Sequence, residues 1–191
     1  MSKKSKPEQF NKKAASVKYK PQEVIKSLGI KPGDIIADIG AGGGFYTFEF
    51  AQKVTETGKV YALDTESSYV EYIKNQIQAR GLKNVEAVLV KNDDIGLTEH
   101  SIDLMFLRNV YHHLPEPIKY FARLKKYLKP HGRIAIIEYN KPRPFFFRLF
   151  HRGRHHTPEA EIVNTLIRCG FVISNRFDFL ADQSFVIFRK E

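Results

Sequence analysis

The sequence predicts an α/β fold with one open sheet of seven mostly parallel strands, helices on both faces and an antiparallel hairpin at the C-terminus. Three observations predict this class. Short apolar runs alternate with helical patterns between residues 35 and 139, as in chains that build parallel sheets. The run 104–107 is apolar on both faces, which is typical of a central strand covered on both sides. Only residues 181–183 separate the last two strands, which is too short for a parallel crossover.

The first half of the chain carries clear start and stop signals for its helices. Pro21 opens a short helix that ends before Gly29, because proline suits a first helical turn and glycine suits a C-terminal stop. After the second strand, Ser68 and Glu71 have capping-box spacing and Gly81 marks the helix end. In chain order we expect a helix at 21–28, a strand at 35–39, a helix at 45–54, a strand at 59–63, a helix at 68–80 and a strand at 85–90.

The second half continues the alternation and then breaks it. A helix at 116–128 directs Phe121 and Leu124 inward, and Gly170 ends a later helix whose apolar positions share one face. Two strands follow that helix without another helix between them, so the last strand must run antiparallel to its neighbour. In chain order we expect a strand at 103–107, a helix at 116–128, a strand at 133–139, a helix at 158–169 and strands at 171–180 and 184–190.

A glycine-rich turn follows the first strand. Asp38 closes the apolar run, and glycines stand at 40, 42 and 44. Glycine admits positive φ and lets a ligand approach the main chain where a Cβ would collide. About twenty residues further on, the second strand ends in Asp64, the kind of acid that hydrogen-bonds ribose hydroxyls in such folds. The pattern indicates an adenosine pocket, although a β-turn-helix corner that needs glycine for packing has the same appearance.

Composition indicates a single domain in a reducing compartment. The chain has 191 residues, of which 42% are hydrophobic, enough for one sizeable core. Its one cysteine, Cys169, excludes an internal disulfide framework and a cysteine-cluster metal site. No apolar run is long enough to span a membrane and the N-terminus lacks a secretion signal, so we expect a cytoplasmic protein.

The net charge of +10 belongs to two segments. Residues 1–20 hold seven lysines and one glutamate, a net charge of +6, and residues 141–156 hold five basic residues and no acid, a net charge of +5. The remainder carries −1. We therefore expect a basic flexible N-terminal arm at 1–20, with residues 1–12 a solvated tail, and a folded domain at 21–191 that contains a basic, Phe-rich insert at 141–156.

These motifs together resemble the class I S-adenosylmethionine-dependent methyltransferases over residues 21–191. Asp38 and the glycines match the first motif of the family, and Asp64 matches its ribose-binding acid. Residues 92–97 stand where the family places an acid near the adenine, and residues 110–114 resemble the small-molecule branch that includes quinone C-methyltransferases. The resemblance implies S-adenosylmethionine as cofactor, bound by Asp38, Gly40, Ala41, Gly42, Gly44, Asp64, Asp93, Asp94 and Arg108.

Each implied role has a structural alternative. Asp38 could cap the turn, Asp64 could cap the next helix, and the Asp93–Asp94 pair could be part of a solvated loop. Tyr46, just after the glycines, is either a packing residue or a contact to the cofactor carboxylate.

Two adjacent histidines are candidates for proton transfer. His112 and His113 follow the strand at 103–107, at the edge of a parallel sheet where ligands gather, and imidazole titrates near neutrality. Our hypothesis is that His113 is the catalytic proton acceptor; the alternative is that the pair packs the loop. Adjacent histidines point in different directions and no cysteine accompanies them, so we expect no metal site.

The insert at 141–156 carries three consecutive phenylalanines among arginines. It could form a wall for an apolar acceptor, contact an anionic membrane, or fold under the helix at 158–169. The sequence thus predicts methyl transfer to a small, apolar or amphipathic acceptor. An RNA methyltransferase and a non-catalytic nucleotide-binding regulator stay open, with nucleic acid the less favoured partner. A nicotinamide dehydrogenase is a weaker rival, because a dinucleotide fingerprint counted from Gly40 would end on Phe45.

Overall fold

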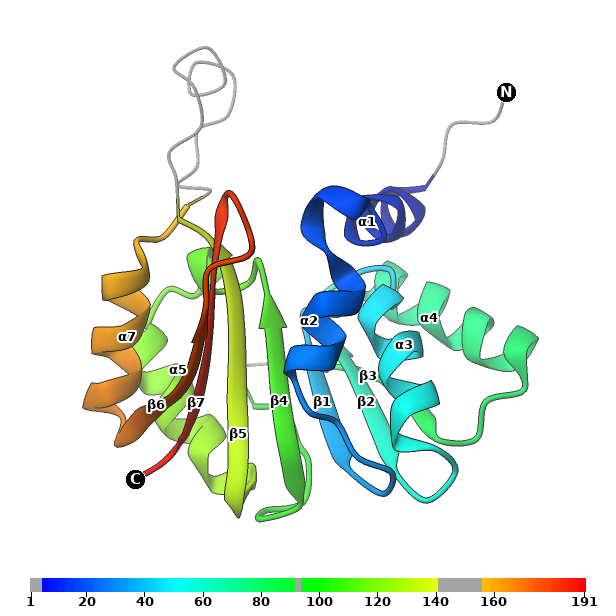
Figure 1. The fold of residues 1–191 in the computed structure, drawn as a ribbon. Helices are drawn as coiled ribbons and strands as arrows, with labels where there is room; N and C mark the ends of the chain where they lie inside the picture. Colours follow the sequence, from blue (N-terminus) through cyan, green and yellow to red (C-terminus); the bar gives the residue numbers. More distant parts are fainter. Residues whose placement is uncertain (1–4, 92–93, 141–155) are drawn as a thin grey trace.

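The chain folds around one sheet of seven strands, in the order β3-β2-β1-β4-β5-β7-β6 (Figure 1). A computed structural model describes residues 5–91, 94–140 and 156–191. Only β7 runs antiparallel to the other strands, pairing with β5 and β6. The strands are β1 (Ile35–Ile39), β2 (Lys59–Asp64), β3 (Val85–Leu89), β4 (Ile102–Arg108), β5 (Leu128–Tyr139), β6 (Phe171–Phe177) and β7 (Gln183–Lys190). The predicted fold class is confirmed.

Helices cover both faces of this sheet (Figure 1). One face is covered by α2, α3 and α4, and the other by α5 and α7. The α-helices are α1 (Lys6–Ala14), α2 (Pro21–Ser27), α3 (Phe45–Val54), α4 (Ser67–Arg80), α5 (Pro117–Leu124) and α7 (Glu159–Arg168). Short 3₁₀ turns are η1 (Val17–Tyr19), η2 (Tyr111–His113) and η3 (Lys125–Tyr127). Among these helices, none is long and apolar enough to cross a membrane.

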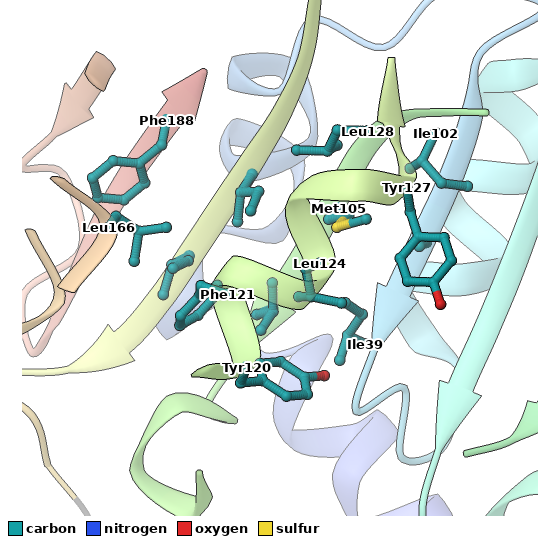
Figure 2. Close-up of a cluster of buried hydrophobic side chains, with 14 of the residues drawn as sticks. Ile39, Ile102, Met105, Tyr120, Phe121, Leu124, Tyr127, Leu128, Leu166 and Phe188 are labelled. Atoms are coloured by element: carbon teal, nitrogen blue, oxygen red, sulfur yellow. The ribbon is translucent and has the colours of Figure 1, made fainter. Parts of the chain in front are cut away.

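The larger core cluster fills the face under α5 and α7. Figure 2 shows Phe121 and Leu124 of α5 in one cluster with Met105 of β4, and Leu166 of α7 near Phe188 of β7. Phe121 and Met105 are fully buried. Burying one such side chain contributes roughly 1.5–3 kcal/mol, so this layer anchors β4 and β5, the strands that end at the pocket described below.

The strand order reverses between β1 and β4. β1 pairs with β2 on one side and with β4 on the other. From β1 the chain continues to β2, whereas from β4 it continues in the opposite direction to β5. Loops that follow β1 and β4 therefore diverge at the C-terminal edge of the sheet. In open α/β sheets ligands bind in the crevice at this point.

Several element boundaries differ from the sequence prediction, and the largest difference is at the junction of α5 and β5. The helix expected at 116–128 ends at Leu124, because Leu128 already pairs with Ile102 at the start of β5. The strand expected at 171–180 ends at Phe177. The helix α4 is capped by Glu66, whose carboxylate accepts from the Ser68 N–H, and not by the predicted Ser68 capping box. The backbone of Glu66 is extended, which lets its side chain reach the free N–H groups at the N-terminus of α4.

The expectation of a solvated tail at residues 1–12 is wrong for its second half. Residues 6–14 form α1, which starts with a capping box between Ser5 and Glu8. Pro7 and Ala14 are buried, and Phe10 packs edge-to-face on Tyr69 of α4 at 5.6 Å between ring centroids. A lysine-rich composition concealed these contacts, which use few apolar side chains and fix α1 over the glycine turn (Figure 1).

Candidate active site

A pocket of about 730 Å³ opens at the C-terminal edge of the sheet, towards which the β4 arrow points in Figure 1. Its wall is contributed by α1, the turn between β1 and α3, the residues after β2 and the segment from β4 into η2. This volume lies within the roughly 300–1,000 Å³ of small-molecule sites. The strand reversal therefore positions a pocket where the fold predicts one.

The glycine turn forms one side of the pocket. Gly40, Gly42 and Gly44 have φ of 72°, 58° and 80°, which favour glycine. Two of them also have a close neighbour in the direction that a Cβ would take. A Cβ on Gly40 would meet the Val110 side chain, and a Cβ on Gly42 would lie 3.3 Å from the Phe10 ring. The glycines are therefore needed both for the turn itself and for close packing, while Gly40 and Gly42 also line the pocket.

Gly44 differs from the other two predicted glycines. It does not line the pocket in the part of the chain that the structure describes. A Cβ there would meet Phe48 and Ile73 at 2.9 and 3.2 Å, so Gly44 is a packing position at the start of α3.

Asp64 connects the end of β2 to the glycine turn. Its carboxylate accepts from the Gly42 N–H at 2.8 Å and from the Glu66 N–H at 3.0 Å, and it lines the pocket. The first bond fixes the turn against β2, and the second holds the backbone of Glu66, which is itself the N-cap of α4.

Asp38 is buried at the base of the pocket, with 4% of its surface exposed. The Thr47 hydroxyl donates to its carboxylate at 2.6 Å. Burial above all, and the nearby Asp64 to a smaller extent, raise the pKa of Asp38 to about 7, against the lowering effects of the Thr47 hydrogen bond and Arg108. A cation at this point of the pocket would favour the charged carboxylate.

Arg108 places a cation at the end of β4. Its guanidinium lies over the rings of Tyr19 and Tyr46, at 5.0 and 5.6 Å from their centroids. Within the described part of the chain, the Nη2 of Arg108 and the hydroxyl of Tyr46 are both buried without a hydrogen-bond partner, and both residues line the pocket. Buried donors of this kind are normally paired, so the pair is suited to an anionic ligand group.

The two predicted histidines also line the pocket. His112 and His113 belong to η2 and both line the pocket, with ring centroids 4.0 Å apart. His112 Nδ1 lies 3.0 Å from Oε1 of Glu138, a fully buried carboxylate on β5. Sequence analysis missed Glu138. The available signal was one acid that follows the apolar run 134–137 of an inner strand.

Asp94 lies away from the pocket. It is exposed, and its carboxylate accepts from the Tyr127 hydroxyl and, at 3.1 Å, from the Gly96 N–H. The Tyr127 hydrogen bond holds the pKa of Asp94 below its usual value. Asp94 does not line the pocket in the described structure, which fits the solvated-loop alternative. Asp93 and the insert residues 141–155 lie outside the described residues.

Sequence analysis also missed the contribution of α1. Phe10, Asn11 and Lys13 line the pocket. Asn11 donates to the Gly43 carbonyl at 2.8 Å and accepts from the Phe45 N–H at 3.0 Å. These two bonds hold α1 against the turn.

Among residues 5–91, 94–140 and 156–191, no three His, Cys, Asp or Glu side chains are grouped as metal ligands would be.

Comparison with known proteins identifies the family. Residues 30–169 match the family model described as a methyltransferase domain. The chain is 29% identical over 125 residues to the ubiquinone/menaquinone biosynthesis C-methyltransferase UbiE of Francisella tularensis subsp. novicida, an alignment that covers 65% of this chain and 50% of the relative. The chain thus spans about half the length of the curated relatives it matches.

Solved structures agree in fold. An S-adenosylmethionine-dependent methyltransferase from Aquifex aeolicus superposes with a TM-score of 0.82 at 28% identity, covering 97% of this chain and 98% of that one. The trans-methyltransferase CalH, in complex with S-adenosylhomocysteine, superposes with a TM-score of 0.69 at 18% identity, covering 84% of this chain and 52% of that one. The chain therefore belongs to the methyltransferase-domain family, within the class I S-adenosylmethionine-dependent enzymes, and resembles the quinone C-methyltransferases.

Proposed function

We propose that the protein transfers a methyl group from S-adenosylmethionine to a small apolar or amphipathic acceptor, of the quinone class that its relatives' names give. One observation carries the proposal. The glycine turn and its two acids line the same pocket as the histidine pair, so a donor and an acceptor could meet inside it. Acceptor specificity resides in the walls of this site and not in the fold.

The residues present fit the cofactor. Arg108 Nη2 and the Tyr46 hydroxyl are unpaired donors suited to its carboxylate, and buried Asp38 is suited to its ammonium. Asp64 stands at the end of β2, where a ribose diol would be held. We propose these roles together with the turn residues Gly40, Ala41 and Gly42, which line the pocket.

The chemistry asks for alignment more than for activation. S-adenosylmethionine, when bound, supplies a methyl group on a sulfonium sulfur that keeps the bond's electron pair when the methyl leaves. The chain must hold the acceptor atom about 3 Å from that carbon and exclude water. Phe10 covers the turn from α1, and Leu114 and Pro115 add apolar wall beside the histidines.

A proton leaves the acceptor when a carbon or a hydroxyl is methylated. His112 and His113 both line the pocket and could receive it. The sequence hypothesis names His113, and this assignment stays a prediction, as does contact of residues 141–156 with an anionic membrane. A cytoplasmic location also stays a prediction.

Labelled methyl transfer tests the proposal. The protein is incubated with methyl-labelled S-adenosylmethionine and a cell extract, which is then separated into lipid, small-molecule, RNA and protein fractions. We expect label in the lipid or small-molecule fraction. Label in RNA would support the RNA methyltransferase alternative instead. No label in any fraction, with S-adenosylhomocysteine binding retained in calorimetry, would overturn catalysis and favour a regulator.

A further inference from the structure

Burying the carboxylate of Glu138 carries a cost in folding free energy. Glu138 is fully buried in β5, directly after four buried apolar residues at 134–137. An ionised carboxylate inside a protein costs several kcal/mol unless it is paired and hydrogen-bonded. The strand would be satisfied by another apolar side chain, so packing alone gives no reason for an acid here.

The contacts of Glu138 converge on His112. Oε1 lies 3.0 Å from His112 Nδ1 and accepts from the Tyr139 N–H at 3.0 Å, and Oε2 accepts from the His112 N–H at 3.4 Å. Both carboxylate oxygens are therefore used, one on the ring and one on the backbone of the same residue. The side chain of His112 is 8% exposed, so the ring is held in a largely dry environment.

This pairing selects one form of the imidazole. An ionised carboxylate only accepts hydrogen bonds, so Nδ1 carries the hydrogen in the neutral ring. Nε2 is then the basic nitrogen, and it lies on the opposite side of the ring from Glu138. His112 lines the pocket, so the ring that carries this nitrogen forms part of the pocket wall.

We propose that His112 Nε2 takes the acceptor's proton and that Glu138 is its positioning residue, an inference that rests on the proposed methyl transfer. A new bond forms between the acceptor and the methyl carbon as the carbon–sulfur bond breaks, and S-adenosylhomocysteine leaves with the electron pair. The acceptor's proton passes to Nε2, and the imidazolium is stabilised by Glu138 until it loses the proton to water. The base is then His112, whereas the sequence hypothesis names the neighbouring His113.

Two isosteric variants test the pair. His112→Asn keeps a donor near Nδ1 but removes Nε2, and Glu138→Gln keeps the shape but removes the charge. The assay is the initial rate of methyl transfer to a total lipid extract over a range of S-adenosylmethionine concentrations. We expect kcat to fall about 100-fold or more in His112→Asn and about 10–100-fold in Glu138→Gln. The KM for S-adenosylmethionine and the affinity for S-adenosylhomocysteine should change less than about twofold, since neither residue belongs to the cofactor half of the pocket.

Matched controls are exposed residues of the same types. His131 is an exposed residue in the first part of β5, and Glu86 on β3 has a half-exposed side chain. The control variants are His131→Asn and Glu86→Gln. Both should retain the wild-type kcat. Imidazole added to His112→Ala should restore part of the rate, whereas a purely structural role of His112 would give no such rescue.

A tautomer measurement is independent of turnover. In the wild-type protein, ¹⁵N-resolved NMR of the histidine rings should show His112 with hydrogen on Nδ1, and Glu138→Gln should disturb that preference. A wild-type ring with hydrogen on Nε2, or a Glu138→Gln variant with unchanged kcat, would overturn the inference while methyl transfer stands. If the wild-type protein labels neither the lipid nor the small-molecule fraction yet binds S-adenosylhomocysteine, the proposed function itself fails, and the role of His112 fails with it.

Discussion

The two halves of the pocket are built by different means. The half between β1 and β2 is made of backbone: a turn whose glycines have positive φ, tied to β2 through a hydrogen bond between Asp64 and Gly42. The half between β4 and β5 is made of side chains, and its central contact joins His112 to Glu138, 26 residues apart. Backbone geometry leaves a local signature in a sequence, whereas a contact between neighbouring strands does not.

The difference also separates two tasks. The backbone half offers a fixed shape and, together with the side chains of Asp38 in β1 and Arg108 at the end of β4, presents opposite charges to a ligand that carries both charges. The side-chain half offers a proton acceptor with one defined basic edge. If this division is real, substitutions in the first half should change ligand affinity, and those in the second should change turnover.

The largest effect on affinity is expected from Gly42→Val. Gly42 and Gly81 have almost the same φ, 58° and 63°, so a valine at either position adds similar backbone strain of about 1–3 kcal/mol. At Gly42 the Cβ also meets Phe10 at 3.3 Å beside the pocket, whereas at Gly81 nothing lies within 4 Å. We expect calorimetry to show at least about a 100-fold loss of S-adenosylhomocysteine affinity in Gly42→Val.

Gly81→Val is the matched control for that change. It should lower the free energy of unfolding by a comparable strain and leave S-adenosylhomocysteine affinity intact. Equal affinities in the two variants would break the comparison, because the glycine turn would then serve only internal packing.

Arg108→Met comes next in size. It removes the buried, unpaired Nη2 while keeping much of the side-chain volume over Tyr46. Hydrogen bonds to charged groups contribute about 1.5–3 kcal/mol, so affinity for S-adenosylhomocysteine should fall about 10–100-fold. Arg168→Met, an exposed change at the end of α7, should leave the affinity as it is. If Arg108→Met bound normally, the carboxylate of the ligand would have to be held elsewhere.

Asp38 gives a pH dependence of known sign. Because burial raises the pKa of Asp38 to about 7, the carboxyl is mostly neutral at pH 6 and mostly charged at pH 8. A ligand ammonium prefers the charged form, so S-adenosylhomocysteine affinity should rise about tenfold between pH 6 and pH 8. Asp38→Asn should bind more weakly and lose this dependence. Titration calorimetry at both pH values checks it, and an unchanged dependence in the variant would assign it to another group.

The raised pKa of Asp38 predicts that the stability of the ligand-free protein falls as pH rises, whereas ligand affinity rises with pH. The pKa of Asp38 is higher in the folded chain than the ordinary value of 3.8, so the folded state binds the proton more tightly than the unfolded state. Without ligand, the contribution of Asp38 therefore favours folding below about pH 4 and is lost as pH rises to about 7. At about 1.4 kcal/mol per pKa unit, the loss is up to about 4 kcal/mol. Denaturant unfolding of Asp38→Asn should lack this component.

How much the sequence could predict follows from the same contrast. The strands, the glycine turn, Asp38 and Asp64 were predictable because each depends on local periodicity, φ or position at a strand end. The position of Asp94 outside the pocket was not predictable, because its carboxylate is hydrogen-bonded by Tyr127, a residue 33 positions away. Glu138 was missed for a similar reason, since its partner lies on the preceding crossover. Sequence patterns report the geometry of one segment and not the pairing of two.

The smallest expected effect concerns Asn11, which joins the N-terminal helix to the backbone half. Asn11→Ala removes its bonds to the Gly43 carbonyl and the Phe45 N–H, which together contribute about 1–3 kcal/mol to the docking of α1. Hydrogen exchange should become faster in α1 alone, and S-adenosylhomocysteine affinity should fall a few-fold. Asn75→Ala, at an exposed position of α4, serves as the control. Faster association and dissociation of S-adenosylhomocysteine with unchanged affinity is the opposite outcome and would make α1 a cover over the turn and not part of its wall. The expected loss of affinity would instead show that α1 belongs to the backbone half of the pocket. Hydrogen bonds from Asn11 to the main chain of the glycine turn hold α1 there, although about thirty residues of sequence separate the two.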